Sequence, residues 1–128
     1  MRKYSKEEKH DFIEKMTIRS KKFAIDTIKF CETLPKTTAC RNISFQLIRS
    51  GTSTGANYRA TCRARSKAEF HSKISIVVEE ADESLFWLEV IDDANILCNK
   101  NELKRLQEMA TEIIKVTSRA RKTNSNKE

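Results

Sequence analysis

The chain has 128 residues, of which 38% are hydrophobic and 34% charged, enough for one domain and too few for two independent cores. Two glycines and one proline supply too little turn chemistry for the hairpins of a β-sandwich or barrel, which excludes the all-β classes. The formal net charge of +7 favours a polyanionic partner.

No stretch approaches the roughly 18 uncharged apolar residues of a membrane span. The first ten residues lack the apolar segment of a signal peptide, and the four cysteines share no C-x-x-C spacing. We therefore expect a soluble cytoplasmic protein with reduced thiols and no membrane contact.

The only proline, Pro35, places the end of a first helix, because an interior proline removes a backbone donor and clashes with the preceding turn. This helix is expected to run from near Ser5 to near Leu34. Its apolar residues recur at steps of three to seven and predict one buried stripe. The stripe comprises Phe12, Met16, Phe23, Ile28, Cys31 and Leu34.

A second helix over residues 40–64 carries both glycines on its apolar face. Gly51 and Gly55 lie one turn apart, and a glycine inside a helix costs about 1 kcal/mol relative to alanine. The pair therefore favours a close approach of another backbone, with a helix break over residues 50–55 as the alternative. The whole face comprises Ser44, Leu47, Ile48, Gly51, Gly55, Tyr58 and Cys62.

Two capping patterns predict where the third and fourth helices begin. Ser66-x-x-Glu69 predicts a helix over about residues 67–97, and Asn99-x-x-Glu102 predicts one that ends near Arg121. Residues 122–128 are polar, and we expect them to be a disordered tail. The predicted core positions are Phe70, Ile74, Val77, Val78, Ala81, Leu85 and Leu88 in the third helix and Leu103, Leu106, Met109, Ala110, Ile113, Val116, Thr117 and Ala120 in the fourth.

Four long helices with short loops predict an all-α fold, an antiparallel up-down-up-down four-helix bundle formed by residues 1–121 as one domain. In that topology the N-terminus, the turn between the second and third helices and the C-terminus share one end, which we call the basic pole. Its basic side chains outnumber acidic ones thirteen to five: Arg2, Lys3, Lys6, Lys9, Arg59, Arg63, Arg65, Lys67, Lys73, Arg119, Arg121, Lys122 and Lys127 against Glu7, Glu8, Asp11, Glu69 and Glu128. Such a surface is typical of phosphate-backbone binding, although a basic surface that only aids solubility is the alternative.

The third helix is acidic, since residues 68–98 carry eight acidic side chains and one basic one. The acids either solvate its outer faces and pair with neighbouring helices or meet another subunit. Four arginines on one flank of the second helix form either a nucleic-acid track or partners for these acids: Arg41, Arg49, Arg59 and Arg63.

The third helix also carries a second apolar stripe, opposite its core face. Its rings are either covered by neighbouring helices or meet another subunit, and we expect self-association. The stripe comprises Ile76, Phe86, Trp87, Val90, Ala94 and Leu97, and its first five members are the predicted oligomer interface.

Catalytic and metal-binding motifs are scarce. His10 and His71 lie in no nucleophile or zinc-protease motif, and Glu7-x-x-His10 is only half of a di-iron signature. Three cysteines are expected to gather opposite the basic pole, where buried free thiols are commoner than a soft metal site or a redox sensor: Cys31, Cys40 and Cys98. We expect no enzyme, no cofactor and no metal.

The run RSGTSTGANYRATCRARSKAEFHSKISIVVEEADESLFWLE, residues 49–89, resembles the bacterial four-helix-bundle family named for intervening sequences in large-subunit ribosomal RNA genes and often labelled a ribosomal protein. It is more distantly similar to the accessory protein of diversity-generating retroelements, a basic pentamer that engages a reverse transcriptase and RNA. The resemblance implies an all-α bundle, a homopentamer and a role linked to nucleic acid. The family pattern and the basic pole coincide at Asn57, Tyr58, Arg59, Arg63, Arg65 and Lys67, and the pole adds Lys73, Arg119, Arg121 and Lys122 to the expected binding surface.

These observations lead to the hypothesis of a non-enzymatic accessory protein that binds RNA or another polyanion, through phosphate contacts more than base readout. The competing hypothesis is a structural adaptor that recruits a protein such as a polymerase or reverse transcriptase. Fold membership by itself does not decide between them.

Overall fold

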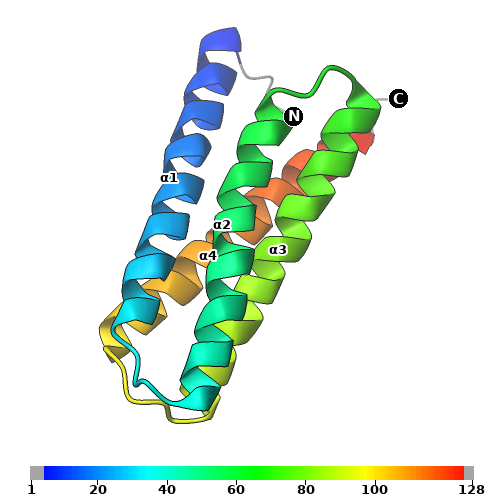
Figure 1. The fold of residues 1–128 in the computed structure, drawn as a ribbon. Helices are drawn as coiled ribbons and strands as arrows, with labels where there is room; N and C mark the ends of the chain where they lie inside the picture. The colour runs from blue at the N-terminus through cyan, green and yellow to red at the C-terminus, as the bar shows by residue number, and fades with distance from the viewer. Residues whose placement is uncertain (1–4, 126–128) are drawn as a thin grey trace.

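The computed structural model describes residues 5–125 and places them in four helices (Figure 1). These are α1 (Lys6–Glu32), α2 (Thr38–Cys62), α3 (Lys67–Asp93) and α4 (Lys100–Ser125). Each helix packs against the next along the chain, and α1 meets α4 to close the bundle. The antiparallel up-down-up-down four-helix bundle is therefore confirmed. No helix within residues 5–125 is long and apolar enough to cross a membrane.

Each helix begins at a side chain that caps it. Ser5, Thr37, Ser66 and Asn99 each accept a hydrogen bond from the backbone amide three residues later, at 3.0 to 3.1 Å. Such caps satisfy backbone donors that have no partner inside the helix. The caps predicted at Ser66 and Asn99 are confirmed, and with Thr37 they mark where the loops between the helices end.

The core side chains follow alternating steps of three and four residues along each helix. This spacing is that of a coiled-coil seam and matches helices packed nearly parallel. In α3 the series is Ile74, Val77, Ala81, Ser84, Leu88 and Ile91, and in α4 it is Leu103, Leu106, Ala110, Ile113 and Thr117.

The glycine pair lies where α1 and α2 touch, and α2 continues through residues 50–55 without a break. A methyl group added at Gly51 would lie 3.1 Å from Thr27 Cγ2, and one added at Gly55 would lie 3.0 Å from the backbone oxygen of Ser20. Both distances are shorter than ordinary van der Waals contact. The prediction of a close backbone approach is confirmed at Gly55, whereas at Gly51 the near neighbour is the side chain of Thr27.

Two residues of the predicted α1 stripe are exposed, so that part of the prediction is wrong. Phe12 is 55% exposed and Ile28 is 39% exposed. Thr17 already lies beside Cys62, the last residue of α2, with 3.9 Å between Oγ1 and Sγ. The first turns of α1 therefore extend past the end of α2, as Figure 1 shows at the start of the chain, which leaves Phe12 without a facing helix.

Two helix ends differ from the prediction. The helix α3 ends at Asp93 because Asn95 adopts a left-handed backbone (φ 54°), and the Ile96 amide donates to the Ile91 carbonyl at 3.1 Å. Leu97 therefore lies outside the helix and is 80% exposed. The helix α4 continues through Ser125, so the first four residues of the expected tail are helical, and residues 126–128 lie outside the described residues.

Candidate nucleic-acid interface

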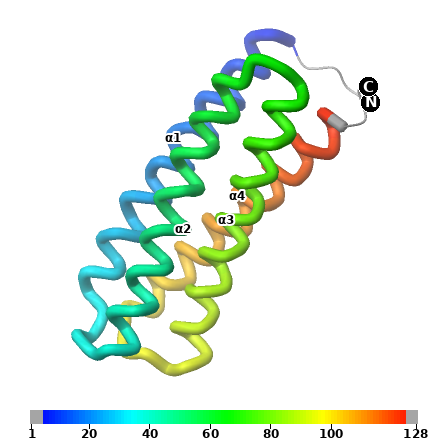
Figure 2. The backbone as a smooth tube through the Cα atoms, turned by 45° about the vertical axis from the view of Figure 1, so that its right-hand side comes forward, coloured from blue at the N-terminus to red at the C-terminus, as the bar shows by residue number. Residues whose placement is uncertain are grey.

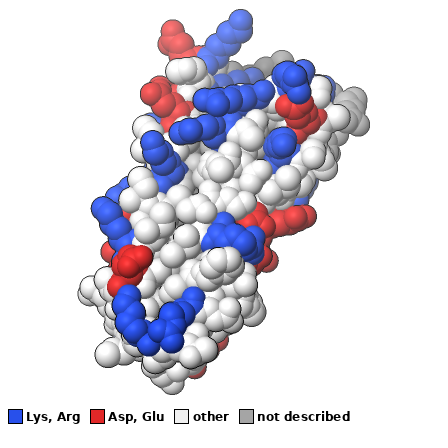
Figure 3. Space-filling model, viewed as in Figure 1, with Lys and Arg blue, Asp and Glu red and all other residues white. Residues whose placement is uncertain are grey.

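The structure brings the start of α3 and the end of α4 together at the basic pole. The side-chain amide of Asn124 donates to the backbone oxygen of Lys67 at 3.4 Å, which holds the last turn of α4 against the first turn of α3. The turn between α2 and α3 and the end of α4 lie at the same end of the bundle (Figure 2). In Figure 3, lysine and arginine side chains gather at this end with acidic side chains among them, and further basic side chains lie at the opposite end. Arg2, Lys3, Lys127 and Glu128 lie outside the described residues.

Four of the predicted binding residues are exposed cations that pair with no acid in the part of the chain that the structure describes: Arg59, Arg63, Arg119 and Lys122. Among the described residues no carboxylate lies within 4.0 Å of any of them. Arg65 contacts Glu69 at 3.5 Å, but its side chain is 87% exposed and an exposed pair of this kind contributes little. Lys73 is half-buried. The under-paired positive charge therefore concentrates at the end of α2, in the turn that follows it and on α4.

Two of the predicted binding residues, Asn57 and Tyr58, make contacts inside the protomer rather than standing free at its surface. Tyr58 is buried, and its burial, with a smaller contribution from Cys62, raises the pKa of its phenol. The amide nitrogen of Asn57 is half-buried and donates to both the backbone oxygen and the hydroxyl of Ser53 at 2.9 Å. The sequence carried this signal, because Tyr58 shares the apolar face of Leu47.

The four arginines on the flank of α2 do not act as one set. Arg49 pairs with Glu80 at 3.3 Å and with Glu83, and the hydrogen bond that it donates to Glu83 is the largest cause of its raised pKa. This arginine thus joins α2 to the acidic helix α3 within the same chain. Arg41, Arg59 and Arg63 have no acid within 4.0 Å among the described residues.

The second apolar stripe of α3 is partly covered by its own bundle. Trp87 and Val90 pack against the core, and Trp87 Nε1 donates to Glu83 at 3.2 Å. Phe86 remains 54% exposed, with its ring edge-on to Trp87 at 5.0 Å between centroids. Ile76 is half-buried, and Ala94 is the exposed residue that ends the helix. Of the proposed oligomer interface, Phe86 is therefore the large ring that points away from the protomer.

The cysteines expected opposite the basic pole do not form a metal site. Cys31 and Cys40 are buried and Cys98 is half-buried, and burial raises the pKa of Cys31 to about 11, which keeps its thiol protonated. Among the described residues, the only group of three with ligand atoms within 4.8 Å of one another is His10, Asp11 and Glu14. These three are exposed on one stretch of α1, and no buried residue joins the group.

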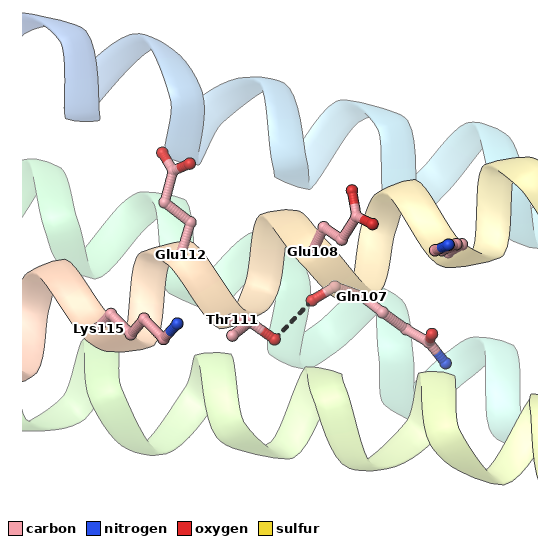
Figure 4. A pocket seen from close by; sticks show the side chains of 6 residues that line it. Gln107, Glu108, Thr111, Glu112 and Lys115 are labelled. Atoms are coloured by element: carbon pink, nitrogen blue, oxygen red, sulfur yellow. Dashed lines mark hydrogen bonds between the residues drawn. The ribbon is translucent and has the colours of Figure 1, made fainter.

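The groove along the outer face of α4 also lacks converging chemical groups. It encloses about 550 Å³, and all six residues that line it come from this one helix (Figure 4): Lys104, Gln107, Glu108, Thr111, Glu112 and Lys115. Thr111 donates to the backbone oxygen of Gln107 at 2.8 Å, and Glu112 is paired with Arg19. The first bond lies within α4 and the second joins α4 to α1. The groove therefore has no cluster of polar groups that point at one ligand position.

The sequence matches the family described as the 23S rRNA-intervening sequence protein over residues 13–119. The chain belongs to this family. The family match starts after the first two turns of α1 and ends at Arg119, so Arg121 and Lys122 lie beyond the family's matched region.

A solved relative supports this family assignment. The crystal structure of a protein of unknown function from the S23 ribosomal protein family of Bacteroides thetaiotaomicron has a TM-score of 0.77 to this chain. The two chains are 29% identical, and the match covers 86% of this chain and 97% of the other. A comparison with curated proteins finds no match.

Proposed function

We propose that the protein is a non-enzymatic accessory protein that binds RNA through its basic pole. One observation carries the proposal: Arg59, Arg63, Arg119 and Lys122 are exposed there, and no described carboxylate lies within 4.0 Å of them. Cations of this kind release counterions from a phosphate backbone when they bind it. The description of the family, an intervening-sequence protein of 23S rRNA, supports RNA as the polyanion.

Binding is led by phosphate contacts, and its sequence preference is modest. Tyr58, the aromatic residue expected at this surface, is buried, so its ring has no face for stacking on a base. Arginine and lysine side chains that contact phosphates position a nucleic acid without reading its sequence.

The test is a salt titration with a structured RNA. Replacing Arg59, Arg63 and Arg65 by alanine removes three charges from the pole, and we expect weaker binding of every RNA. The slope of log K against log salt should also become shallower, by about 0.7 to 0.9 for each phosphate contact that is lost. The matched control replaces Lys29, Lys36 and Lys104, three exposed lysines elsewhere on the bundle. Affinity that hardly changes with salt, or equal losses in both triple variants, contradicts the proposal.

A structural adaptor is the second candidate, favoured by exposed apolar side chains that phosphate binding does not use. Ile18 and Ile25 point outward from α1, 61% and 42% exposed, and Phe86 does so from α3. A partner such as a polymerase that stays bound after nuclease treatment, and is lost on replacing Ile18 and Ile25 by serine, would favour the adaptor.

The protein also self-associates, in our proposal, through the outward face of α3. Phe86 lies among the acids Glu79, Asp82 and Glu89 on that face. The face therefore combines an apolar contact with negative charge, and a basic surface on another copy of the chain is complementary to it. A closed pentamer is the arrangement that the family resemblance implies. Several basic poles in one assembly would raise the affinity for a long RNA.

A further inference from the structure

A surface groove follows the seam between α1 and α2 at Gly55, where the backbones of the two helices approach each other closely. It encloses about 200 Å³ and its floor is made of small residues, Ala24, Gly55 and Ala56. The groove exists because Gly55 lets α2 approach the Ser20 carbonyl, and because no large side chain from either helix fills the space above that contact. A ligand can thus approach the two backbones closely.

The walls of this groove carry positive charge that pairs with no carboxylate among residues 5–125. Lys21 projects from α1 and Arg59 from α2, both are exposed, and no acidic residue lines the groove. No carboxylate among residues 5–125 lies within 4.0 Å of either side chain. The hydroxyls of Thr17 and Thr52 already donate to the backbone oxygens of Ile13 and Ile48, at 2.8 and 2.7 Å. The groove therefore offers two cationic donors from opposite walls, an arrangement suited to an anionic ligand.

We propose that the groove between α1 and α2 binds a phosphodiester group of RNA, held from opposite walls by Lys21 and Arg59. The inference rests on the proposed RNA-binding function and extends it. A strand bound in the groove would run from the pole along the seam between α1 and α2. Arg63 lies one turn beyond Arg59, about 6 Å along the helix, and connects the groove to the pole. Lys21 becomes a binding residue that α1 contributes.

A charge test compares Lys21→Gln and Arg59→Gln with Lys29→Gln, an exposed lysine of α1 that does not line the groove. The probe is a single-stranded oligouridylate, titrated at several salt concentrations. We expect each groove variant to bind several-fold more weakly and to lower the salt slope by about 0.7, while Lys29→Gln changes the slope much less. A competition experiment adds inorganic phosphate to the complex of the protein with the oligouridylate, with chloride at equal ionic strength as the control. It distinguishes a site for free phosphate from a site for the RNA backbone. We expect inorganic phosphate to displace the oligouridylate no better than chloride does.

A steric test leaves the charges unchanged. Ala56→Leu places a larger side chain at the groove, and Ala39→Leu makes the same change at an exposed position in the first turn of α2, at the end of the bundle opposite the pole. We expect several-fold weaker RNA binding for Ala56→Leu and wild-type binding for Ala39→Leu, with equal thermal unfolding midpoints for all variants.

The outcomes separate the groove from the function. If Lys21→Gln and Ala56→Leu bind like the wild type while the triple variant at Arg59, Arg63 and Arg65 is weakened, RNA lies at the pole alone and the groove is overturned. If inorganic phosphate competes as well as the oligonucleotide, the groove is a site for free phosphate and the inference is also overturned. If the wild type shows no salt-dependent binding, the proposed function fails and the groove fails with it.

Discussion

Asp26 is a nearly buried carboxylate of α1 that bonds to a side chain of α4. It is 9% exposed and accepts hydrogen bonds from Arg105 at 2.8 Å and from Lys22 at 3.2 Å, while Arg105 also binds Glu102. Desolvation alone raises the pKa of this carboxyl, but the bonds and charges of Arg105 and Lys22 together outweigh it, so the pKa lies below its ordinary value of 3.8. The ionised form is therefore the one that the fold stabilises.

A pH-dependent loss of stability follows for this carboxyl. A lowered pKa contributes stability that is complete above the unfolded value of 3.8 and is lost as the pH falls through the lower folded value. We expect Asp26→Asn to lower the free energy of unfolding by about 1–3 kcal/mol at neutral pH, because Arg105 loses a charged acceptor. In urea denaturation between pH 7 and pH 2, the free energies of unfolding of the wild type and of Asp26→Asn should become equal at the acidic end. A difference that stays constant with pH would contradict this role.

The glycine pair makes a second prediction about single residues. Gly51→Leu and Gly55→Leu should each cost about 1–3 kcal/mol of stability, because the added bulk separates α1 from α2. In a helix, alanine is favoured over glycine by about 1 kcal/mol. For Gly51→Ala this gain offsets the cost of the close contact between the new methyl group and the Thr27 side chain. At Gly55 the obstacle is the Ser20 backbone oxygen, which no side-chain rotation removes, so Gly55→Ala should destabilise more than Gly51→Ala. Unchanged melting temperatures in both leucine variants would contradict the close contact.

At the scale of the element, the end of α3 depends on one left-handed residue. Asn95 adopts φ 54°, and the amides of Asn95 and Ile96 donate to the carbonyls of Asp92 and Ile91 at 3.0 and 3.1 Å. Asparagine and glycine tolerate this backbone, whereas a β-branched residue does not. The loop to α4 therefore starts four residues earlier than the apolar pattern suggested.

Substitution at Asn95 tests this helix end. We expect Asn95→Gly to keep the melting temperature within a few degrees of the wild type, and Asn95→Val to lower the free energy of unfolding by about 1–2 kcal/mol, the cost of a left-handed β-branched residue. Thermal and urea denaturation of both variants measure the difference. Equal stability of the valine and glycine variants would show that the left-handed turn does not persist in solution.

At the scale of the whole molecule, Phe86 tests the proposed self-association. Trp87 packs on the core and bonds Glu83, so its replacement would disturb the protomer itself, whereas Phe86 lies outside. We expect Phe86→Glu to release folded monomers in sedimentation velocity and to weaken the binding of long RNA. Phe45→Glu, which makes the same change at an exposed phenylalanine of α2, is the control. A wild-type protein that sediments as a monomer at micromolar concentration would contradict the proposal.

The sequence alone determined the local structure of this protein. Pro35 and the capping residues Ser66 and Asn99 act on their own neighbours, and the apolar repeat of each helix follows its own axis, so the bundle and its topology could be derived without coordinates. The close approach at Gly51 and Gly55 was predictable for the same reason, because a glycine on an apolar helix face has few other uses.

Only the tertiary structure decided which charges remain unpaired and which rings are covered. Arg49 and Arg59 lie on the same flank of α2, yet Arg49 meets Glu80 and Glu83 while Arg59 lies beside Lys21 in the groove. The difference depends on the register between neighbouring helices and on how far each extends, and the periodicity of one helix contains neither quantity. An ion pair or a groove needs atoms from two helices within a few ångströms of each other, so it is decided only when the helices pack.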